Sequence, residues 1–413
     1  MENQTGHSLH VSNENPQGGA SAVKCVTLLT ILVMTLTSNL FVLWAVLLRR
    51  RSRNNGFSRI KSLTRVQLFM VHLSVADILV ALLNITPQLA WVITVDFRGG
   101  VLLCKGITYA QVLVLYLSTY ILTGMSLDRL ISMRAIYAQW RSGMPLTNGA
   151  NFPSTSICSR PLAIGAEASH RLSHFNNHHS RVEYRKFAKV LIVVAWLLAF
   201  VLALPQLYIF SYIAIPPADI NASSLTDADK PYNAQDIAQP ANERVRHNCL
   251  ADFSFHPHGK QIYVTSFVVI VLGVPVFVML FSYSYMCVII LRIQRGYDSE
   301  QSQMLPANQT PSVNGGFAVS NQRLTAAKMR LVKMTFAVVL CFIVCWSPFC
   351  VAELVSAYTL VKKAETHHVS ALLIICMLLA SLNSAMNPWI YAAFYARGNR
   401  RKRQDKSISS DIT

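Results

Sequence analysis

The chain has 413 residues, of which 53% are hydrophobic and only 14% charged, whereas soluble domains carry about 25% charged residues. This composition excludes an ordinary soluble domain and indicates a polytopic membrane protein. The net charge of +18 does not indicate a nucleic-acid partner, because the basic residues lie between apolar segments, where membrane topology accounts for them.

The N-terminal 22 residues are polar and contain no Lys or Arg, so they lack the charged region of a signal peptide. We expect residues 1–22 to form an extracellular tail, with Asn3 in a glycosylation sequon. The receptor domain that follows, 23–394, contains seven apolar segments long enough to span a bilayer. They cover 23–48, 67–94, 102–130, 187–211, 260–292, 330–360 and 369–394. The sequence therefore predicts an all-α membrane protein, a bundle of seven transmembrane helices.

The connections between these segments alternate in charge, and this predicts their orientation. Residues 49–65 and 131–186 and the short tail 395–413 are rich in Arg and Lys, whereas 212–258 is rich in Asp. We therefore expect the N-terminus outside and the C-terminus in the cytoplasm. The acidic segment 212–258 becomes an outer loop, in which Asn221 can be glycosylated.

Two of the inner connections are long and polar. Residues 138–186 are rich in Ser, Asn and His, and residues 293–325 are rich in Gln, Ser and Asn. Such compositions favour disordered, solvated loops. The His content of 138–186 raises metal binding as an alternative, but its spacing matches no ligand pattern, so we expect no metal site.

The third apolar segment carries a different chemical group at each end. A helix rises about 1.5 Å per residue, so Cys104 and Arg129 lie roughly 37 Å apart, at opposite membrane faces. Gln111 and Ser118 are polar residues between them, which we expect to face protein rather than lipid. Asp128 precedes Arg129, and the guanidinium can pair with this neighbour or reach a partner in a cavity.

Asp77 lies inside the second apolar segment, where a carboxylate is costly and needs partners. The candidates are polar residues on other segments, namely Asn39, Ser118, Asn383, Ser384 and Asn387. Together they suit a sodium ion or a hydrated polar network near mid-bilayer. The alternative is a neutral carboxylic acid that only joins helices by hydrogen bonds.

Two proline motifs interrupt the last two segments. Pro348 follows Trp346 in the sixth, and Asn387 and Pro388 precede Tyr391 in the seventh. Each proline removes a backbone hydrogen bond and kinks its helix. A kink beside a large ring suits a switch that couples a pocket to the inner end; the alternative is a plain kink in each helix.

Cys104 and Cys249 both lie at the outer face in this topology. An oxidising exterior favours a disulfide between them, which would pin the outer loop to the third helix. The alternative is two free thiols.

These features in this order resemble the rhodopsin-like (class A) G-protein-coupled receptors. The resemblance covers roughly residues 25–400, and the joint spacing is highly specific. It rests on Asn39, Asp77, Cys104 with Cys249, Asp128-Arg129, Trp196, Pro275 with Tyr283, CWSP at 345–348 and NPWIY at 387–391.

The chain is most similar to the vasopressin/oxytocin receptor family. The matching motifs are TPQLAW at 86–91, AQVLVLYLSTYIL at 110–122, ALPQ at 203–206, CWSPF at 345–349 and NPWIY at 387–391. The resemblance implies that Gln88, Gln111 and Gln206 line a peptide pocket with amides, together with Phe349. Receptors for neuropeptide S and crustacean cardioactive peptide share part of the pattern and remain alternatives.

Three departures make the expected pocket more acidic or less basic. The family commonly has Gln in place of Glu353, Lys in place of Thr108 and Arg in place of Asp96. We therefore expect a ligand with a cationic residue, or a pocket tuned away from the vertebrate hormones. On the inner side, Lys328 occupies a position where many receptors have an acid that locks Arg129, so we expect that lock to be absent.

The resemblance implies a plasma-membrane receptor that binds a short peptide outside and activates a heterotrimeric G protein inside, by analogy with receptors that raise calcium. Arrestin, a receptor kinase and membrane lipid are further expected partners. A transporter or channel is the remote alternative, since the two halves show no internal repeat. A retinal-based sensor lacks the required Lys in 369–394, and no nucleophile–base pair indicates an enzyme.

Overall fold

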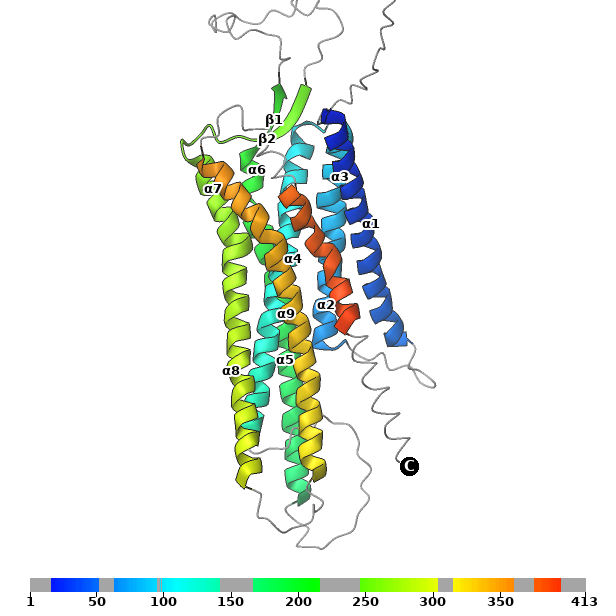
Figure 1. Cartoon of the computed structure of the whole chain (residues 1–413), viewed down its shortest axis with the longest axis vertical. Coiled ribbons are helices and arrows are strands. Elements are labelled where there is room, and N and C mark those ends of the chain that lie inside the picture. The colour runs from blue at the N-terminus through cyan, green and yellow to red at the C-terminus, as the bar shows by residue number, and fades with distance from the viewer. Residues whose placement is uncertain are drawn as a thin grey trace, which may run out of the picture.

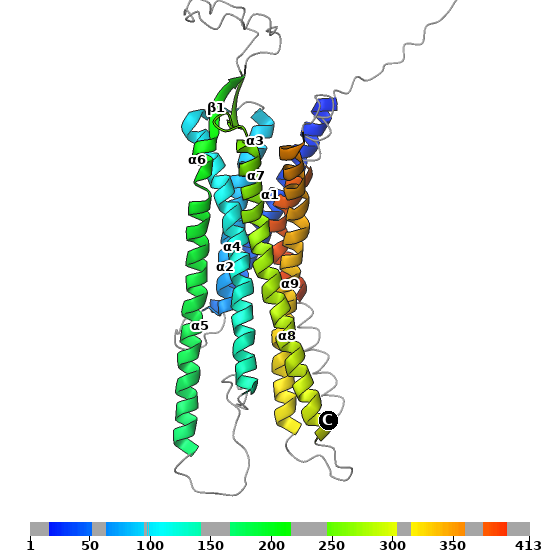
Figure 2. The same ribbon diagram turned by 90° about the vertical axis from the view of Figure 1, so that its left-hand side faces the viewer.

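The computed structural model describes residues 16–51, 63–94, 97, 99–141, 166–215, 246–303, 315–359 and 375–394. Long helices run side by side along one direction, and a small β-hairpin lies at one end of them (Figures 1 and 2). We call this end the hairpin end, and the opposite end, where Arg129 lies, the Arg129 end. The fold is thus the expected helical bundle.

The helices account for the seven predicted spans. Six helical stretches of the described residues are long and apolar enough to cross a membrane, and the helix at 375–394 supplies the seventh span. The elements are α1 (Pro16–Arg51), α2 (Arg65–Val80), the π-turn η1 (Ala81–Ile85), α3 (Thr86–Thr94), α4 (Gly100–Arg141), α5 (Ala166–Leu202), α6 (Pro205–Ile209), α7 (Gly259–Val268), the π-turn η3 (Val269–Gly273), α8 (Val274–Gln303) and α9 (Gly315–Tyr358).

Several helices extend beyond the predicted spans, which corrects part of the loop predictions. α4 continues to Arg141, α5 begins at Ala166, α8 continues to Gln303, and α9 begins at Gly315. Residues 131–141 and 166–186 contain neither Pro nor Gly, so nothing in these stretches stops a helix at the membrane surface. Of the two loops expected to be disordered, 142–165 and 304–314 lie outside the described residues.

The sequence does not predict the β-hairpin, because the composition of 212–258 indicates only an acidic loop. Strands β1 (Phe210–Ile215) and β2 (Arg246–Ala251) pair antiparallel, with Tyr212 opposite Cys249. The ladder satisfies backbone groups that would otherwise lack partners close to the membrane. Cys249 is joined to Cys104 of α4, with 5.5 Å between their Cα atoms, so the predicted disulfide is confirmed.

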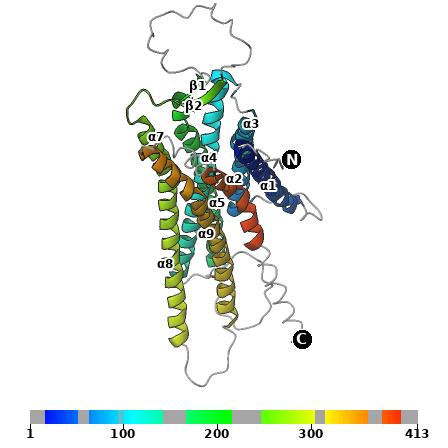
Figure 3. The ribbon, with the colours of Figure 1, turned by 45° about the horizontal axis from the view of Figure 1, so that its top comes forward.

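The core surrounds α4, which packs against α2, α5 and α8. Its fully buried positions include Leu117, Ile121 and Met125, which recur every four residues on one helix face. Large apolar side chains also cover the outside of the bundle, among them Phe41, Trp44, Phe277, Phe281 and Trp389. An apolar core with an apolar exterior suits a bundle surrounded by lipid. The helix at 375–394 lies between α9 and α1 (Figure 3).

Candidate functional site

A polar cluster lies inside the bundle around Asp77 of α2. This side chain is fully buried, and its carboxylate accepts hydrogen bonds from Ser118 Oγ and Asn387 Nδ2, both at 2.9 Å. Ser384 also lies beside it. Asn39 of α1 donates to the backbone oxygen of Ser384 at 3.0 Å. Three of the five predicted partners, Ser118, Ser384 and Asn387, therefore lie beside Asp77, whereas Asn39 is connected to it through Ser384.

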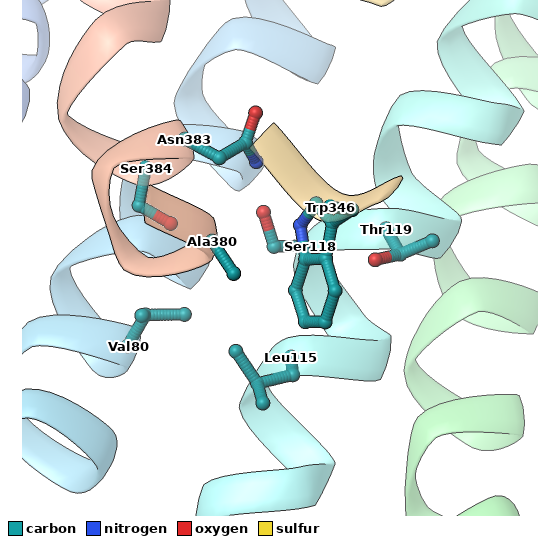
Figure 4. Close-up of a pocket in the computed structure, with 8 residues that line it drawn as sticks. All are labelled: Val80, Leu115, Ser118, Thr119, Trp346, Ala380, Asn383 and Ser384. Atoms are coloured by element: carbon teal, nitrogen blue, oxygen red, sulfur yellow. The ribbon is translucent and has the colours of Figure 1, made fainter. Parts of the chain in front are cut away.

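A small cavity of about 10 Å³ adjoins this cluster (Figure 4). This volume has room for about one water or small ion. Trp346 forms one wall of the cavity. The other lining residues are polar or apolar: the polar ones are Ser118, Thr119, Asn383 and Ser384, and the apolar ones are Val80, Leu115 and Ala380.

Three hydrogen-bond acceptors in and beside the cluster lack a donor within the described part of the chain. The amide oxygens of Asn39, Asn383 and Asn387 are buried and have no hydrogen-bond donor among the described residues. A carboxylate, hydroxyls and unpaired amide oxygens are the oxygen ligands that hard cations prefer. The residues present therefore fit a small cation such as Na⁺.

A second charged cluster lies at the Arg129 end. Arg129 Nη2 lies 3.2 Å from Asp128 Oδ2, so the guanidinium pairs with its neighbour, one of the two predicted arrangements. Arg129 is 5% exposed, and its Nε and Nη2 make no hydrogen bond with the described residues. Tyr283 and Tyr391 lie close enough to interact electrostatically with it. Asp128, Tyr283 and Tyr391 thus surround the guanidinium.

A row of aromatic rings connects the hairpin end with the central cavity. Pro348 lies inside α9, and the rings of Trp346 and Phe349 flank it with centroids 6.1 Å apart. Phe349 in turn meets Phe267 edge-to-face at 6.5 Å, near the π-turn η3. Neighbouring rings therefore form a continuous path of contacts from Phe267 through Phe349 to Trp346, which is part of the cavity wall.

Two of the three predicted glutamines occupy polar positions toward the hairpin end. Gln88 Nε2 donates to Asn84 Oδ1 at 2.9 Å, and Gln206 Nε2 donates to the Tyr263 hydroxyl at 2.7 Å. Gln206 is only 2% exposed. The amide oxygens of both glutamines are buried and have no donor among the described residues. Gln111 is half-buried on α4, the helix that packs against α6.

The acidic residue Glu353 lies half-buried on α9 beside a basic partner. Lys260 of α7 attracts the Glu353 carboxylate, and its Nζ donates to the Ser356 backbone oxygen at 3.0 Å. The positive charge of Lys260 therefore partly neutralises the negative charge that Glu353 adds to the expected pocket. Thr108, the other departure described here, is buried and donates to the Cys104 backbone oxygen at 3.0 Å.

Some predicted residues lie outside the described part of the chain. They are Asp96 in the expected pocket, Asn3 and Asn221 in the sequons, and the side chain of Lys328. The structure therefore tests none of these predictions.

Sequence reasoning missed Arg65, Tyr263 and Tyr120. Arg65 appeared only as one member of a basic stretch, yet its Nη1 lies 3.2 Å from Asp128 Oδ1. Tyr263 and Tyr120 form hydrogen bonds between helices, to Gln206 and to the Ile270 backbone oxygen. A tyrosine in a lipid-spanning segment is a usable signal, because its hydroxyl needs a partner there.

The comparisons with known proteins agree with this geometry. The seven-transmembrane receptor (rhodopsin family) pattern matches residues 38–143 and 231–391. The chain belongs to this family of multi-pass plasma-membrane receptors, and it is not an enzyme.

Within the family, the chain resembles receptors of the vasopressin and oxytocin group. It is 30% identical to the mesotocin receptor of Rhinella marina, over 95% of this chain and 79% of the relative. It is 28% identical to the annetocin receptor of Eisenia fetida, over 91% and 80% of the two chains. The human vasopressin V1b receptor is 29% identical, over 93% and 78%.

Proposed function

We propose that the chain is a receptor for a short peptide of the vasopressin/oxytocin type. The hairpin end faces the outside and binds the peptide, and the Arg129 end faces the cytoplasm and activates a heterotrimeric G protein. Calcium release is the expected signal. Short peptides of other types, such as neuropeptide S or crustacean cardioactive peptide, are the alternative ligands, and arrestin, a receptor kinase and membrane lipid are further partners.

Gln206 carries the proposal for ligand binding. Its side chain is 2% exposed and held by Tyr263, while its amide oxygen has no donor among the described residues. A buried acceptor without a partner costs about 1–3 kcal/mol, so a ligand that supplies an N–H group gains this energy. The amide oxygen of Gln88 offers a second acceptor of the same kind. Peptide backbones and amidated termini carry such N–H donors.

The coupling runs through α9. A ligand shifts a conformational equilibrium only if it binds one arrangement more tightly than the other. A peptide that contacts Phe349 moves the ring row, and the bend at Pro348 lets the rest of α9 swing. The swing opens the Arg129 end, where Arg129 and Tyr391 then meet the G protein.

The charges at the hairpin end favour a peptide with a cationic residue. Glu353 carries a carboxylate there, although Lys260 already attracts it. Asp252, next to β2, accepts a hydrogen bond from the Ser254 backbone N–H at 2.9 Å, which lowers the pKa of its carboxyl below the ordinary value for an aspartate. A Glu353→Lys variant that keeps full potency for a basic peptide would contradict this preference.

The test is a signalling screen in cells that express the full chain. Calcium release and cyclic AMP are measured during exposure to oxytocin-like, vasopressin-like and other amidated neuropeptides, with untransfected cells as the control. We expect a response to a vasopressin/oxytocin-type peptide at submicromolar concentration, roughly −8 kcal/mol of binding free energy or better. Silence to all of these peptides, or ion flux from purified protein in liposomes without a G protein, would overturn the proposal.

We further propose that the Asp77 cluster holds Na⁺ in the resting receptor. Support comes from the carboxylate, the cavity beside it and the three unpaired amide oxygens. The ion would bind Asp77 and Ser118, with Asn383 nearby. In wild-type membranes, replacing NaCl by choline chloride should raise basal signalling, and Asp77→Asn should abolish that salt effect. A wild-type receptor indifferent to Na⁺ would rule the site out.

A further inference from the structure

Arg65 is the first residue of α2 and is held in a fixed local structure. Thr64 caps the helix, since its side chain accepts a hydrogen bond from the Gln67 backbone N–H, and the Gln67 side chain accepts one from the Thr64 backbone N–H. Such a reciprocal cap fixes the start of a helix. The capping box therefore fixes the start of α2 at Arg65, and α2 packs against α4.

The Asp128 carboxylate is shared by two guanidinium groups. Arg65 Nη1 lies 3.2 Å from Oδ1, and Arg129 Nη2 lies 3.2 Å from Oδ2. The Asp128 side chain is completely buried, whereas 29% of the Arg65 side chain and 6% of the Arg129 side chain are exposed. A buried carboxylate needs such compensation, and losing one partner leaves part of its charge unpaired.

The Arg65 guanidinium also lies over an aromatic ring of a third helix. Its Cζ is 5.4 Å from the ring centroid of Tyr184, which belongs to α5. A cation above an aromatic face is attracted by the ring. Arg65 of α2 therefore contacts both α4, through Asp128, and α5, through Tyr184, at the Arg129 end.

We propose that Arg65 is a positioning residue that holds the receptor in its resting arrangement. It anchors one oxygen of Asp128, so that the other oxygen keeps Arg129 along α4 and away from a G protein. This inference rests on the proposed function, because it assigns a restraint to the same Arg129 end.

The direction of the effect follows from the burial of Asp128. Without Arg65, the buried Asp128 carboxylate of the resting, closed arrangement has one cationic partner in place of two, and this loss destabilises the closed arrangement. An open arrangement, in which water reaches Asp128, is affected much less, because solvent replaces the missing partner. Removal of Arg65 therefore shifts the population toward the open arrangement, in which Arg129 is available.

The experiment compares ligand-free signalling of wild type, Arg65→Gln and Arg65→Lys, using sensors for several G-protein classes and correcting for surface expression. We expect Arg65→Gln to raise basal signalling about three- to tenfold and Arg65→Lys to stay within about twofold of wild type. The matched control is Arg134→Gln, because Arg134 is an exposed arginine that also lies over a ring, Tyr285. Its basal signalling should not change.

A second background shows whether Arg65 acts through Asp128. In an Asp128→Asn receptor, Arg65→Gln should add nothing, since the charge that it compensates is gone. An equal additional rise in that background would overturn the proposal. So would unchanged basal signalling in Arg65→Gln, or a rise of the same size in Arg65→Lys or Arg134→Gln.

A measurement without a G protein separates this inference from the proposed function. A wild-type receptor that is silent in every sensor, with every peptide, counts against the proposed function. Amide hydrogen exchange of purified, ligand-free protein then still decides the role of Arg65. We expect the segment around Asp128 to exchange faster in Arg65→Gln than in wild type and Arg134→Gln, and equal rates would overturn the proposal.

Discussion

At the scale of single residues, the informative atoms are buried oxygens without a donor. Those of Asn39, Asn383 and Asn387 belong to the Asp77 cluster and the cavity beside it, whereas those of Gln88 and Gln206 lie toward the hairpin end. A helix bundle that needed only stability would pair these groups or replace them with apolar ones. We therefore associate the first set with a cation and the second with a ligand.

The Gln206 amide gives a residue-scale prediction. Gln206→Ala removes the acceptor and leaves the Tyr263 hydroxyl without its donor, so peptide potency should fall at least about tenfold, or 1.4 kcal/mol. Tyr263→Phe should cost less, since Gln206 keeps its amide. Thr30→Val on the exposed face of α1 is the control and should bind normally. Radioligand competition measures the affinities, and a Gln206→Ala receptor with wild-type affinity would contradict the account.

At the scale of elements, prolines deform the helices and neighbouring side chains cap the freed carbonyls. The π-turn η3 precedes Pro275, and its shifted hydrogen bond runs from Val274 N to Val269 O. The Ile270 carbonyl, which has no proline N–H to meet, accepts a hydrogen bond from the Tyr120 hydroxyl of α4 at 3.2 Å. Such deformed turns are common at functional sites.

The Tyr120 cap gives an element-scale prediction. Tyr120→Phe leaves the Ile270 carbonyl without this donor in an apolar environment and should lower the free energy of unfolding by about 1 kcal/mol. Tyr208→Phe is the matched control, because Tyr208 is 71% exposed. Thermal unfolding of the purified proteins measures the difference. Equal midpoints for Tyr120→Phe and wild type would show that the cap contributes nothing.

At the scale of the whole molecule, hydropathy predicted the bundle, and the polar residues inside apolar segments predicted the contents of its polar centre. Asp77, Ser118 and Asn387 meet as expected, because a carboxylate inside a membrane span has few other polar partners. The ion pair between Arg65 and Asp128 was not predicted, because a basic residue close to the end of a membrane span usually indicates only which side of the membrane that end faces. The hairpin was not predicted either, because its strands are short and separated by a long connection.

In the proposed receptor, an amide-lined pocket at the hairpin end controls Arg129 at the other end. The most direct test is peptide-driven nucleotide exchange on a G protein by purified receptor in lipid nanodiscs, compared between wild type and Arg129→Ala. We predict that a vasopressin/oxytocin-type peptide accelerates exchange at least about tenfold in wild type, while Arg129→Ala still binds the peptide but gives little exchange. Equal peptide-driven exchange by Arg129→Ala, or none by wild type with peptide bound, would contradict the claim.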